Sequence, residues 1–416
     1  MKDVQKILLR ILVCFLLIQC SSNSTHDQPE YTRTLDDIPQ DIQEVENLTV
    51  FSGDAEPTHS VELKPEQTFG KQGKPYLTKV NGCIIDDKGR VIINDFDKKK
   101  EYGFPNVLYA YNADGSYRTQ IGRPGRGPGE YSFIFDMQAK AGKVIVFDLT
   151  NKRLNVYDTD GYALDRTILL ENFKNTNDEA AKGLEFEYVR ARMDGNYLVT
   201  FSNSAPSADN PTNIYLLMDT DGNLLDFEPL EFPSSPSIRP PKSNNPQSPS
   251  LPLPFLGQSL ITLTNDDALY SVWSREFLIK KYDPNGTYQS AIYYPIEGPP
   301  FDLQKYAKAA PFNYKTSEIE KAFEKADKKI PKTARIIADL KVDDQNRIWV
   351  AIPTGIQSET YEWWILEESG RLLAKLTLPR DKPIYDIKNG YLYSKKTNKE
   401  TGTEYVVKYR IELTKG

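Results

Sequence analysis

The sequence predicts an all-β protein built from one repeated unit, and three observations support this. Apolar runs rich in β-branched residues recur along the 416 residues, and tight Asp-Gly or Asn-Gly turns separate them. These turn residues tolerate the positive backbone angles that a hairpin reversal requires. Runs such as 144–147 and 348–351 are apolar at consecutive positions, so both faces of those strands must be buried. Four-stranded blades that cover one another on both faces form a β-propeller, which fits this pattern better than a two-sheet sandwich.

The repeat occurs six times, which predicts six blades of four antiparallel strands each. The copies span residues 83–122, 137–169, 189–230, 260–294, 338–379 and 385–413. Hairpin signals of the Asp-Gly or Asn-Gly kind fall at 114–115, 160–161, 221–222 and 285–286. Residues 47–69 precede the first copy and have no repeat of their own. We expect part of this segment to complete a blade with the last copy and so to close the ring.

Two insertions interrupt the regular spacing. Residues 232–254 are so rich in proline that regular strand pairing is prevented, which predicts an exposed loop; the alternative is a proline segment that docks in an aromatic groove. Residues 301–331 predict one short helix, because Ser317 and Glu320 form a capping-box pattern and Pro331 ends the segment. Its apolar residues share one side: Ile319, Phe323, Ala326 and Ile330. We expect this side to pack against the propeller rim, with a lid or a partner-binding helix as the functional alternative.

The N-terminal residues predict export. A basic leader precedes an apolar run at 11–18, which is too short to cross a hydrocarbon layer of about 30 Å. Residues 17–20 resemble the lipobox of bacterial lipoproteins, although Gln19 stands where that family has a small residue. The resemblance implies that cleavage leaves Cys20 as the lipid attachment site. The alternative is an ordinary secretory signal in which Cys20 is incidental.

Three parts of the chain follow from these observations. Residues 1–19 are predicted to be a lipoprotein signal peptide, 20–46 the lipidated cysteine with a flexible tether, and 47–416 the propeller. The polar, acidic segment 21–46 would span roughly 28 Å as a flexible chain. The folded body could then stand clear of the lipid headgroups.

The charge of the mature chain argues against nucleic acid as a partner. Cleavage after residue 19 removes Lys2, Lys6, Arg10 and Asp3, so the formal charge falls from −6 to −8. Phosphate binding needs clustered Lys and Arg, and no basic stripe is present. We expect the short lysine runs at 98–100 and 328–329 to be solvated surface.

Cysteine usage excludes a disulfide framework. Cys14 lies inside the signal and Cys20 is the proposed lipid site, so Cys83 alone remains in the body. Cys83 begins an apolar strand without a basic neighbour in the sequence. We therefore expect this thiol to be buried rather than redox active.

Residues 121–168 resemble an NHL-type repeat. The parts that carry the resemblance are a glycine-rich segment ending in Gly129-Glu130-Tyr131, a β-hairpin, Asn151 and Arg153 before a strand, and the turn Asp160-Gly161. The whole chain is similar to the six-bladed propeller lipoproteins of Bacteroidetes, which implies the fold but not the biochemical role. The loop 122–129 has a phosphate cradle as its alternative, but no helix follows it and the Walker lysine is missing. We expect Arg123 and Arg126 to stabilise a crossing between blades or to lie on a face of the ring.

Catalytic chemistry has few candidate residues. The only histidines are His26 in the tether and His59 before the first copy, so a Ser-His-Asp triad or a histidine-ligated metal is disfavoured. Propeller enzymes that resemble NHL proteins, such as lactonases and amidating lyases, place metal ligands on the central channel, and this chain lacks the histidines for such a site. Candidate calcium ligands or a glycosidase pair are Asp95, Asp97, Asp148, Asp343 and Asp344. Strand-end aspartate recurs in nearly every copy, so we expect these carboxylates to bind turn amides instead.

Aromatic residues give one further hypothesis. Trp349, Trp363 and Trp364 could stack on a sugar, but their place in β-runs predicts core packing for at least two of them. We therefore assign no catalytic residue, no metal ligand and no cofactor, with calcium as the alternative, and leave the binding residues open.

Two functional hypotheses follow. The first is a non-catalytic, lipid-anchored binding or scaffold module for an envelope protein or glycan, at the outer membrane of a Gram-negative bacterium. The second is a carboxylate- or calcium-dependent enzyme of the cell envelope, a glycan hydrolase or lyase or a lactonase. A convergent cluster of acids at the centre of the ring favours the enzyme, whereas an apolar or dispersed polar centre favours the binding module.

Overall fold

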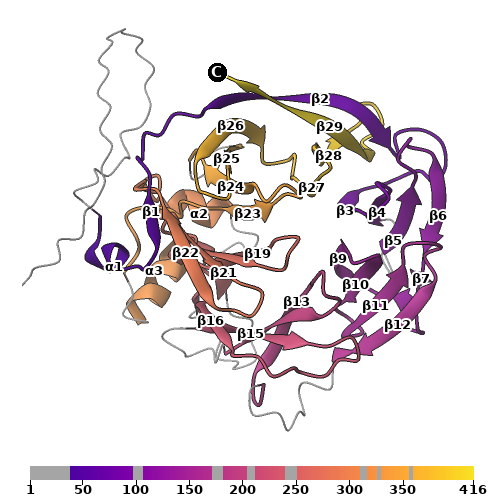
Figure 1. The fold of residues 1–416 in the computed structure, drawn as a ribbon, viewed down its shortest axis with the longest axis horizontal. Coiled ribbons are helices and arrows are strands. Elements are labelled where there is room, and N and C mark those ends of the chain that lie inside the picture. Colours follow the sequence, from indigo (N-terminus) through magenta and orange to yellow (C-terminus); the bar gives the residue numbers. More distant parts are fainter. Residues whose placement is uncertain are drawn as a thin grey trace, which may run out of the picture. The chain divides into compact units, whose positions relative to one another are not determined.

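Six antiparallel sheets follow one another along the part of the chain that the structure describes, and each is built from one predicted repeat (Figure 1). The computed structural model describes residues 38–96, 106–170, 181–203, 211–238, 251–309, 316–325, 329–355 and 359–416. These residues belong to one compact unit, Tyr31–Gly416. The sheets are arranged as blades of a ring, so the predicted all-β, six-bladed β-propeller is confirmed.

Each blade has its first strand nearest the ring axis and its fourth strand at the outer edge (Figure 1). The first blade contains β3 Val80–Ile85, β4 Val91–Phe96, β5 Asn106–Tyr111 and β6 Tyr117–Ile121. The second contains β9 Ile134–Lys140, β10 Lys143–Asp148, β11 Arg153–Asp158 and β12 Leu164–Leu169. The third contains β13 Glu185–Ala191, β14 Tyr197–Ser202, β15 Thr212–Met218 and β16 Leu230–Pro233. The fourth blade contains β19 Ser259–Leu263, β20 Leu269–Trp273, β21 Leu278–Tyr282 and β22 Tyr288–Tyr293. The fifth contains β23 Asp339–Val342, β24 Ile348–Pro353, β25 Thr360–Leu366 and β26 Leu372–Pro379. The sixth contains β27 Asp386–Lys388, β28 Tyr391–Thr397, β29 Glu404–Lys415 and β2 His59–Phe69.

The ring is closed by the N-terminal segment, as predicted. β2 pairs antiparallel with β29 from His59 opposite Lys415 to Phe69 opposite Val406, and it forms the outer strand of the sixth blade. The preceding strand, β1 Leu48–Val50, pairs parallel with β22 instead and adds a fifth strand to the fourth blade. One short segment therefore ties the outer edges of two different blades.

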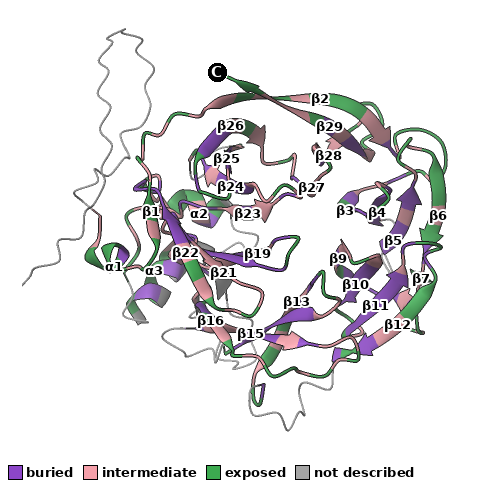
Figure 2. Cartoon of the chain, viewed as in Figure 1, coloured by how far each residue is buried: buried purple, intermediate pink, exposed green. Residues whose placement is uncertain are grey.

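Apolar runs alternate between two interfaces, which explains why they are apolar at consecutive positions. Within 144–147, the two valines join a buried cluster with Leu108 of the first blade, whereas Ile145 and Phe147 join one with Val199 of the third. Figure 2 shows the same contrast across a blade: middle strands such as β10 are buried, and outer strands such as β6 are largely exposed. Burying both faces of the middle strands supplies the hydrophobic core that a chain without disulfides requires.

Tryptophan and cysteine lie in these cores. Trp349, Trp363 and Trp364 are at most 4% exposed, so core packing is confirmed for all three and the sugar-stacking hypothesis is wrong for these rings. Cys83 is a buried free thiol, as predicted, and burial raises its pKa well above the usual value. The inertness of this thiol stays a prediction.

The second insertion contains two short helices rather than the single predicted one, α2 Leu303–Ala309 and α3 Thr316–Lys325. Ile319 and Phe323 are buried in one cluster with Leu253 and Phe255, so the helix buries its apolar side as predicted, but against the end of the first insertion rather than against the strands of a blade. Ile330 is 37% exposed because α3 ends before it, and Ser317 lies inside the helix, which begins at Thr316. Ala326 lies outside the described residues.

The two insertions meet each other at the rim. Most of the proline-rich segment, 239–250, lies outside the described residues. Its flanks, β17 Ser237–Ile238 and β18 Leu251–Pro252, pair with each other and lead into the 3₁₀ helix Pro254–Leu256. Phe255 of that turn stacks on Phe301 at 4.5 Å, so the end of the first insertion packs on the start of the second.

The body also includes the last part of the predicted tether. A short helix, α1 Gln40–Gln43, places Ile42 at 5% exposure, and the Tyr288 hydroxyl donates to the carbonyl of Glu46 at 2.5 Å. Contact with the propeller therefore begins before the predicted boundary at residue 47, because one apolar side chain is enough to anchor this turn. Cys20 lies outside the described residues.

Candidate functional site

The connections between strands divide the ring into two faces, because strand direction alternates within an antiparallel blade. Connections from the first to the second strand and from the third to the fourth define the hairpin face. They are residues 86–90, 112–116, 141–142, 159–163, 192–196, 219–229, 264–268, 283–287, 343–347, 367–371 and 389–390. Connections from the second to the third strand and between blades define the long-loop face. They are residues 70–79, 97–105, 122–133, 149–152, 170–184, 203–211, 234–258, 274–277, 294–338, 354–359, 380–385 and 398–403.

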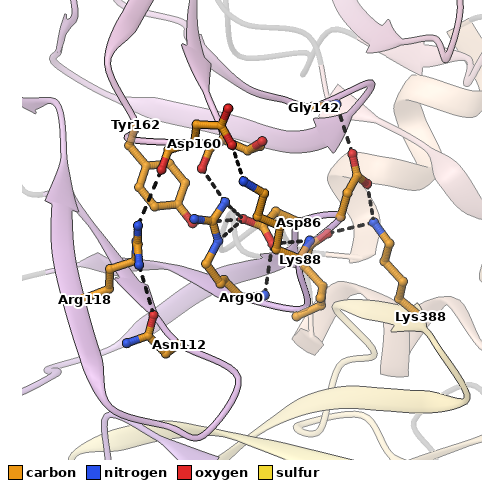
Figure 3. Close-up of polar contacts among 12 residues, drawn as sticks. Asp86, Lys88, Arg90, Asn112, Arg118, Gly142, Asp160, Tyr162 and Lys388 are labelled. Carbon is orange, nitrogen blue, oxygen red and sulfur yellow. Dashed lines mark hydrogen bonds and ion pairs between the residues drawn. The ribbon is translucent and has the colours of Figure 1, made fainter.

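Polar side chains join neighbouring blades on the hairpin face, and Figure 3 shows the sector around the first blade. The buried carboxylate of Asp86 accepts from the Arg90 guanidinium at 2.6 Å and from the Tyr162 hydroxyl of the second blade at 2.9 Å. Lys88 and Asp160 form an exposed ion pair between the same two blades. The turns on this side are therefore held by contacts to the next blade as well as by their own backbone.

The same kind of contact continues around the ring. Asp87 of the first blade accepts from the backbone N–H of Gly142 in the second and from Lys388 Nζ in the sixth, both at 3.0 Å (Figure 3). In the fourth blade, Asp267 accepts from the backbone N–H of Met193 in the third at 2.6 Å. These hydrogen bonds between blades confirm that the first hairpins of different blades lie on one side of the ring.

One lysine crosses toward a blade that is not its neighbour. Lys140 of the second blade donates to Asn265 Oδ1 of the fourth blade at 3.2 Å. Burial lowers the pKa of Lys140, and the nearby carboxylate of Asp267 opposes that shift. On the hairpin face, the first hairpins of the second and fourth blades are therefore close enough for one side chain to reach from one to the other.

The aspartates that could bind calcium or act as a glycosidase pair have structural roles in the described residues. Asp95 accepts from the backbone N–H of Thr78 and of the next residue, at 2.7 and 3.0 Å. Asp148 does the same with Ser132 and its successor, at 3.0 and 3.2 Å. The expectation that strand-end carboxylates bind backbone amides is confirmed for these two.

Asp343 is also a hydrogen-bond acceptor, here for side-chain donors. It accepts from Arg347 Nε at 2.6 Å and from the indole N–H of Trp349 at 2.9 Å. Asp344 accepts from the backbone N–H of Asn389 in the sixth blade at 2.6 Å. Asp97 lies outside the described residues, and nowhere in the described ranges do three His, Cys, Asp or Glu side chains group as a metal site would require.

Two further carboxylates on innermost strands were not singled out by the sequence analysis. Asp136 accepts from Tyr188 and Gln138, and Asp386 accepts from the backbone N–H of Ile85 at 2.9 Å. Burial raises the pKa of both. Each accepts hydrogen bonds from donors of its own or the adjacent blade, so both carboxylates are committed to structural contacts.

The glycine-rich loop 122–133 is a crossing between blades, as expected. Glu130 accepts from the backbone N–H of Gly127 at 2.7 Å and from Arg123 at 2.6 Å, and this places a carboxylate where the phosphate alternative needs an anion. Arg153 donates to the carbonyls of Arg126 and Glu130, at 2.9 and 2.6 Å. The phosphate-cradle alternative is therefore wrong for this loop.

A cavity of about 320 Å³ opens on the long-loop face between the fourth and fifth blades. Its lining residues come from the turn 274–277 and from both ends of the second insertion: Trp273, Arg275, Glu276, Glu297, Gly298, Thr333 and Ile336. Pockets that bind small molecules have volumes of about 300–1,000 Å³ and combine apolar surface with a few polar groups. The volume of this cavity lies at the lower end of that range, and its lining is more polar than apolar.

Arg275 holds the cavity together. Its Nη1 donates to the carbonyls of Phe255 and Thr333, at 2.8 and 3.0 Å, and so ties the ends of both insertions to the fourth blade. Burial lowers the pKa of Arg275, and the neighbouring Glu276 carboxylate opposes that shift. The sequence analysis did not single out this cluster, although Ser274 stands where the first two copies have a strand-end aspartate.

Exposed apolar side chains also lie on the long-loop face. Tyr76 is 74% exposed in the connection 70–79, and Phe133, Phe135 and Leu149 are 37%, 50% and 42% exposed around the end of the second blade. The backbone N–H of Leu149 donates to the carbonyl of Phe133 at 3.1 Å, which fixes these side chains as neighbours. These exposed apolar side chains are a second candidate contact surface on the long-loop face, in addition to the cavity.

Within the described ranges, no helix has the length and apolar character that a bilayer span requires.

Comparisons with known proteins support the fold. A family model named DUF5128 and described as a 6-bladed beta-propeller matches residues 79–226. A member of the duf4221 family from Bacteroides vulgatus has a TM-score of 0.50 at 9% identity, covering 86% of this chain and 100% of that one. A candidate exported protein from Bacteroides fragilis has a TM-score of 0.49 at 14% identity, covering 88% and 99%. Among curated proteins, none matches this sequence. At such identities the likeness to the solved structures concerns the fold alone, and the six-bladed β-propeller is the description of the family model that matches residues 79–226.

Proposed function

We propose that this protein is a lipid-anchored, non-catalytic binding module of the cell envelope that holds its partner on the long-loop face. Cys20 is the proposed anchor, on its lipobox-like position at the end of the apolar run 11–18. An envelope protein or a glycan is the proposed partner. The resemblance of residues 121–168 to an NHL-type repeat suits a scaffold role of this kind.

The observation that carries the proposal is the difference between the two faces. Most hairpin-face connections are tight turns of nearly constant length, the exception being 219–229. Both insertions, and the other extended connections such as 170–184 and 203–211, leave from the long-loop face. Binding residues concentrate on loops that a rigid scaffold positions, because loops tolerate changes in length and sequence that strands do not.

The use of the carboxylates supports binding over catalysis. Asp95, Asp148 and Asp343 each accept backbone or side-chain N–H groups that hold the blades in place. The buried acids Asp136 and Asp386 lie on different blades and accept hydrogen bonds from their own or the adjacent blade. Carboxylates committed to structural contacts in this way favour the binding hypothesis over catalysis.

Site-specific photo-crosslinking in native membranes tests the proposal. A photoreactive amino acid replaces Tyr76 or Leu149 on the long-loop face, or Tyr117 or Met193, which are 43% and 40% exposed on the hairpin face. We expect the same crosslinked partner from both long-loop positions and none from the matched hairpin positions. A partner captured only from the hairpin face, or equally from both faces, would overturn the proposal.

A further inference from the structure

We infer that the cavity between the fourth and fifth blades binds a ring of a neutral glycan, with Trp273 as the stacking surface. This inference names the ligand class for the binding function proposed above and rests on it. It depends on two features of the cavity: a positioned indole ring, and carboxylates that two different connections bring to it.

Trp273 is held in a fixed position at the cavity. Gly257, at the end of the first insertion, lies against the edge of the indole, and a Cβ atom there would be 2.1 Å from Trp273 Cζ2. Gly257 has a φ of +111°, which residues with a side chain rarely adopt. The close approach fixes the ring, whereas Trp349, Trp363 and Trp364 are buried. Trp273 is half-buried, so it keeps apolar surface toward the cavity.

The polar groups suit the hydroxyls of a sugar. Glu276 and Glu297 lie on different connections and bring carboxylate oxygens to the same cavity, together with the Thr333 hydroxyl. A carboxylate accepts several hydrogen bonds, which allows it to bind neighbouring hydroxyls in addition to its protein contacts. Ile336 adds apolar surface beside the ring. Aromatic and apolar surface with a few fixed acceptors is the chemistry that sugar rings need.

The charges of the lining argue against an anionic ligand. Arg275, Glu276 and Glu297 together give the lining a formal charge of −1. The two glutamates repel an anion, which argues against phosphate or acidic sugars. Arg275 also uses Nη1 to hold the carbonyls of Phe255 and Thr333, so its own donors are largely committed to the protein.

Sugar binding is tested with the full-length lipoprotein in a detergent that carries no sugar headgroup. The probes are neutral hexasaccharides of glucose, mannose, xylose and N-acetylglucosamine, measured by calorimetry and tryptophan fluorescence. We expect at least one probe to bind and to shift the emission of Trp273. Trp273→Ala should weaken this binding at least tenfold. Glu297→Gln should weaken it severalfold and leave the melting temperature unchanged, because Glu297 is exposed.

The matched control is Tyr117→Ala, which removes an exposed aromatic residue of the hairpin face and should leave sugar binding unchanged. Binding that survives both Trp273→Ala and Glu297→Gln would overturn the inference. So would the failure of all four probes, or a preference for lysine-rich peptides or acidic sugars. These outcomes are separate from the crosslinking result: a partner captured only from the long-loop face upholds the proposed function even if no sugar binds.

Discussion

Buried aspartates hold strand ends together in this protein by accepting backbone N–H groups from the adjoining crossing. Asp148 is fully buried and accepts from Ser132, the next residue and Asn151, and Arg153 Nε lies 3.5 Å from its carboxylate. A buried carboxylate with several donors stabilises the fold only while all of its hydrogen bonds are made. When the carboxylate is removed, each buried donor has lost its hydrogen bonds to water and gains none in the protein, which costs its full desolvation free energy. The repeated aspartate at this position therefore reflects architecture.

Replacement of Asp148 by Ala should lower the free energy of unfolding by about 3–5 kcal/mol, since it leaves the buried Arg153 without its counter-charge and several N–H groups without their acceptor. The control Asp160→Ala removes an 81% exposed carboxylate that pairs with Lys88, and it should cost less than about 1 kcal/mol. Urea unfolding of both variants measures the difference. A stability unchanged by Asp148→Ala would instead mark Asp148 as a residue kept for function.

At the scale of elements, the pairing of β2 with β29 joins the two ends of the propeller sequence. The register shifts between Pro65 and Gln67, so Glu66 occupies a bulge and has no partner in the ladder. Its carboxylate accepts from Arg410 at 2.6 and 2.9 Å and from the Tyr391 hydroxyl at 3.2 Å. The bulge thus turns one side chain of the closing strand onto the strand beside it.

Acid should loosen this closure. The hydrogen bond from Arg410 holds the pKa of Glu66 below its usual value of 4.5. A carboxylate whose pKa is lowered on folding contributes stability that is present above its unfolded pKa and is lost as the pH falls through the lowered value. The protection of the β2 and β29 amides against hydrogen exchange, corrected for the pH dependence of the intrinsic exchange rate, should therefore fall as the pH drops below 4.5 in the native chain.

Glu66→Gln should remove most of this acid-dependent change, because the variant has no proton to gain at that position. The matched control is Asp160→Asn. The pKa of the Asp160 carboxylate is also lowered, but this residue lies on the hairpin face, away from the closure. It should leave the exchange of β2 and β29 as in the native chain. Equal acid sensitivity of these strands in native protein and Glu66→Gln would show that other groups control the closure.

At the scale of the whole molecule, the ring separates structural contacts from accessible surface. The hairpin face is joined by side chains that reach from blade to blade, including the Asp86 and Asp87 contacts of Figure 3. The long-loop face carries the two insertions and the 320 Å³ cavity, whereas exposed apolar residues lie on both faces, such as Tyr76 on the long-loop face and Tyr117 on the hairpin face. The membrane anchor proposed at Cys20 would hold such a face within reach of envelope partners.

Cys20→Ser should release the protein from the membrane or leave it as an uncleaved precursor, with the fold unchanged. Acyl chains contribute about 0.8 kcal/mol for each buried methylene, and the polar segment 21–37 offers no replacement for them. Membrane fractionation and mass spectrometry of the mature amino terminus measure the outcome. An unmodified native terminus that begins after Cys20 would show a soluble secreted protein, and the unusual Gln19 would explain it.

The sequence alone determined the fold, its closure and the roles of several single residues. Consecutive apolar positions such as 144–147 can be buried only by sheets on both sides, and the Asp-Gly turns fix where each strand reverses. These signals are local and recur in each copy, so one sequence suffices to read them. The same holds for the burial of Cys83 and for the use of Asp95 and Asp148 as amide acceptors.

Only the tertiary structure decided where a ligand could bind. Trp273 and Glu276 lie in one turn, but Glu297, Thr333 and Gly257 come from two insertions whose ends meet at Arg275. No periodicity or spacing in the sequence relates these segments, because their meeting depends on how the fourth and fifth blades pack. The sequence likewise left open which part of residues 47–69 closes the ring, and only long-range packing pairs β2 with β29 and β1 with β22. Repetition made the architecture readable, and the non-repeating contacts between distant segments required the folded ring.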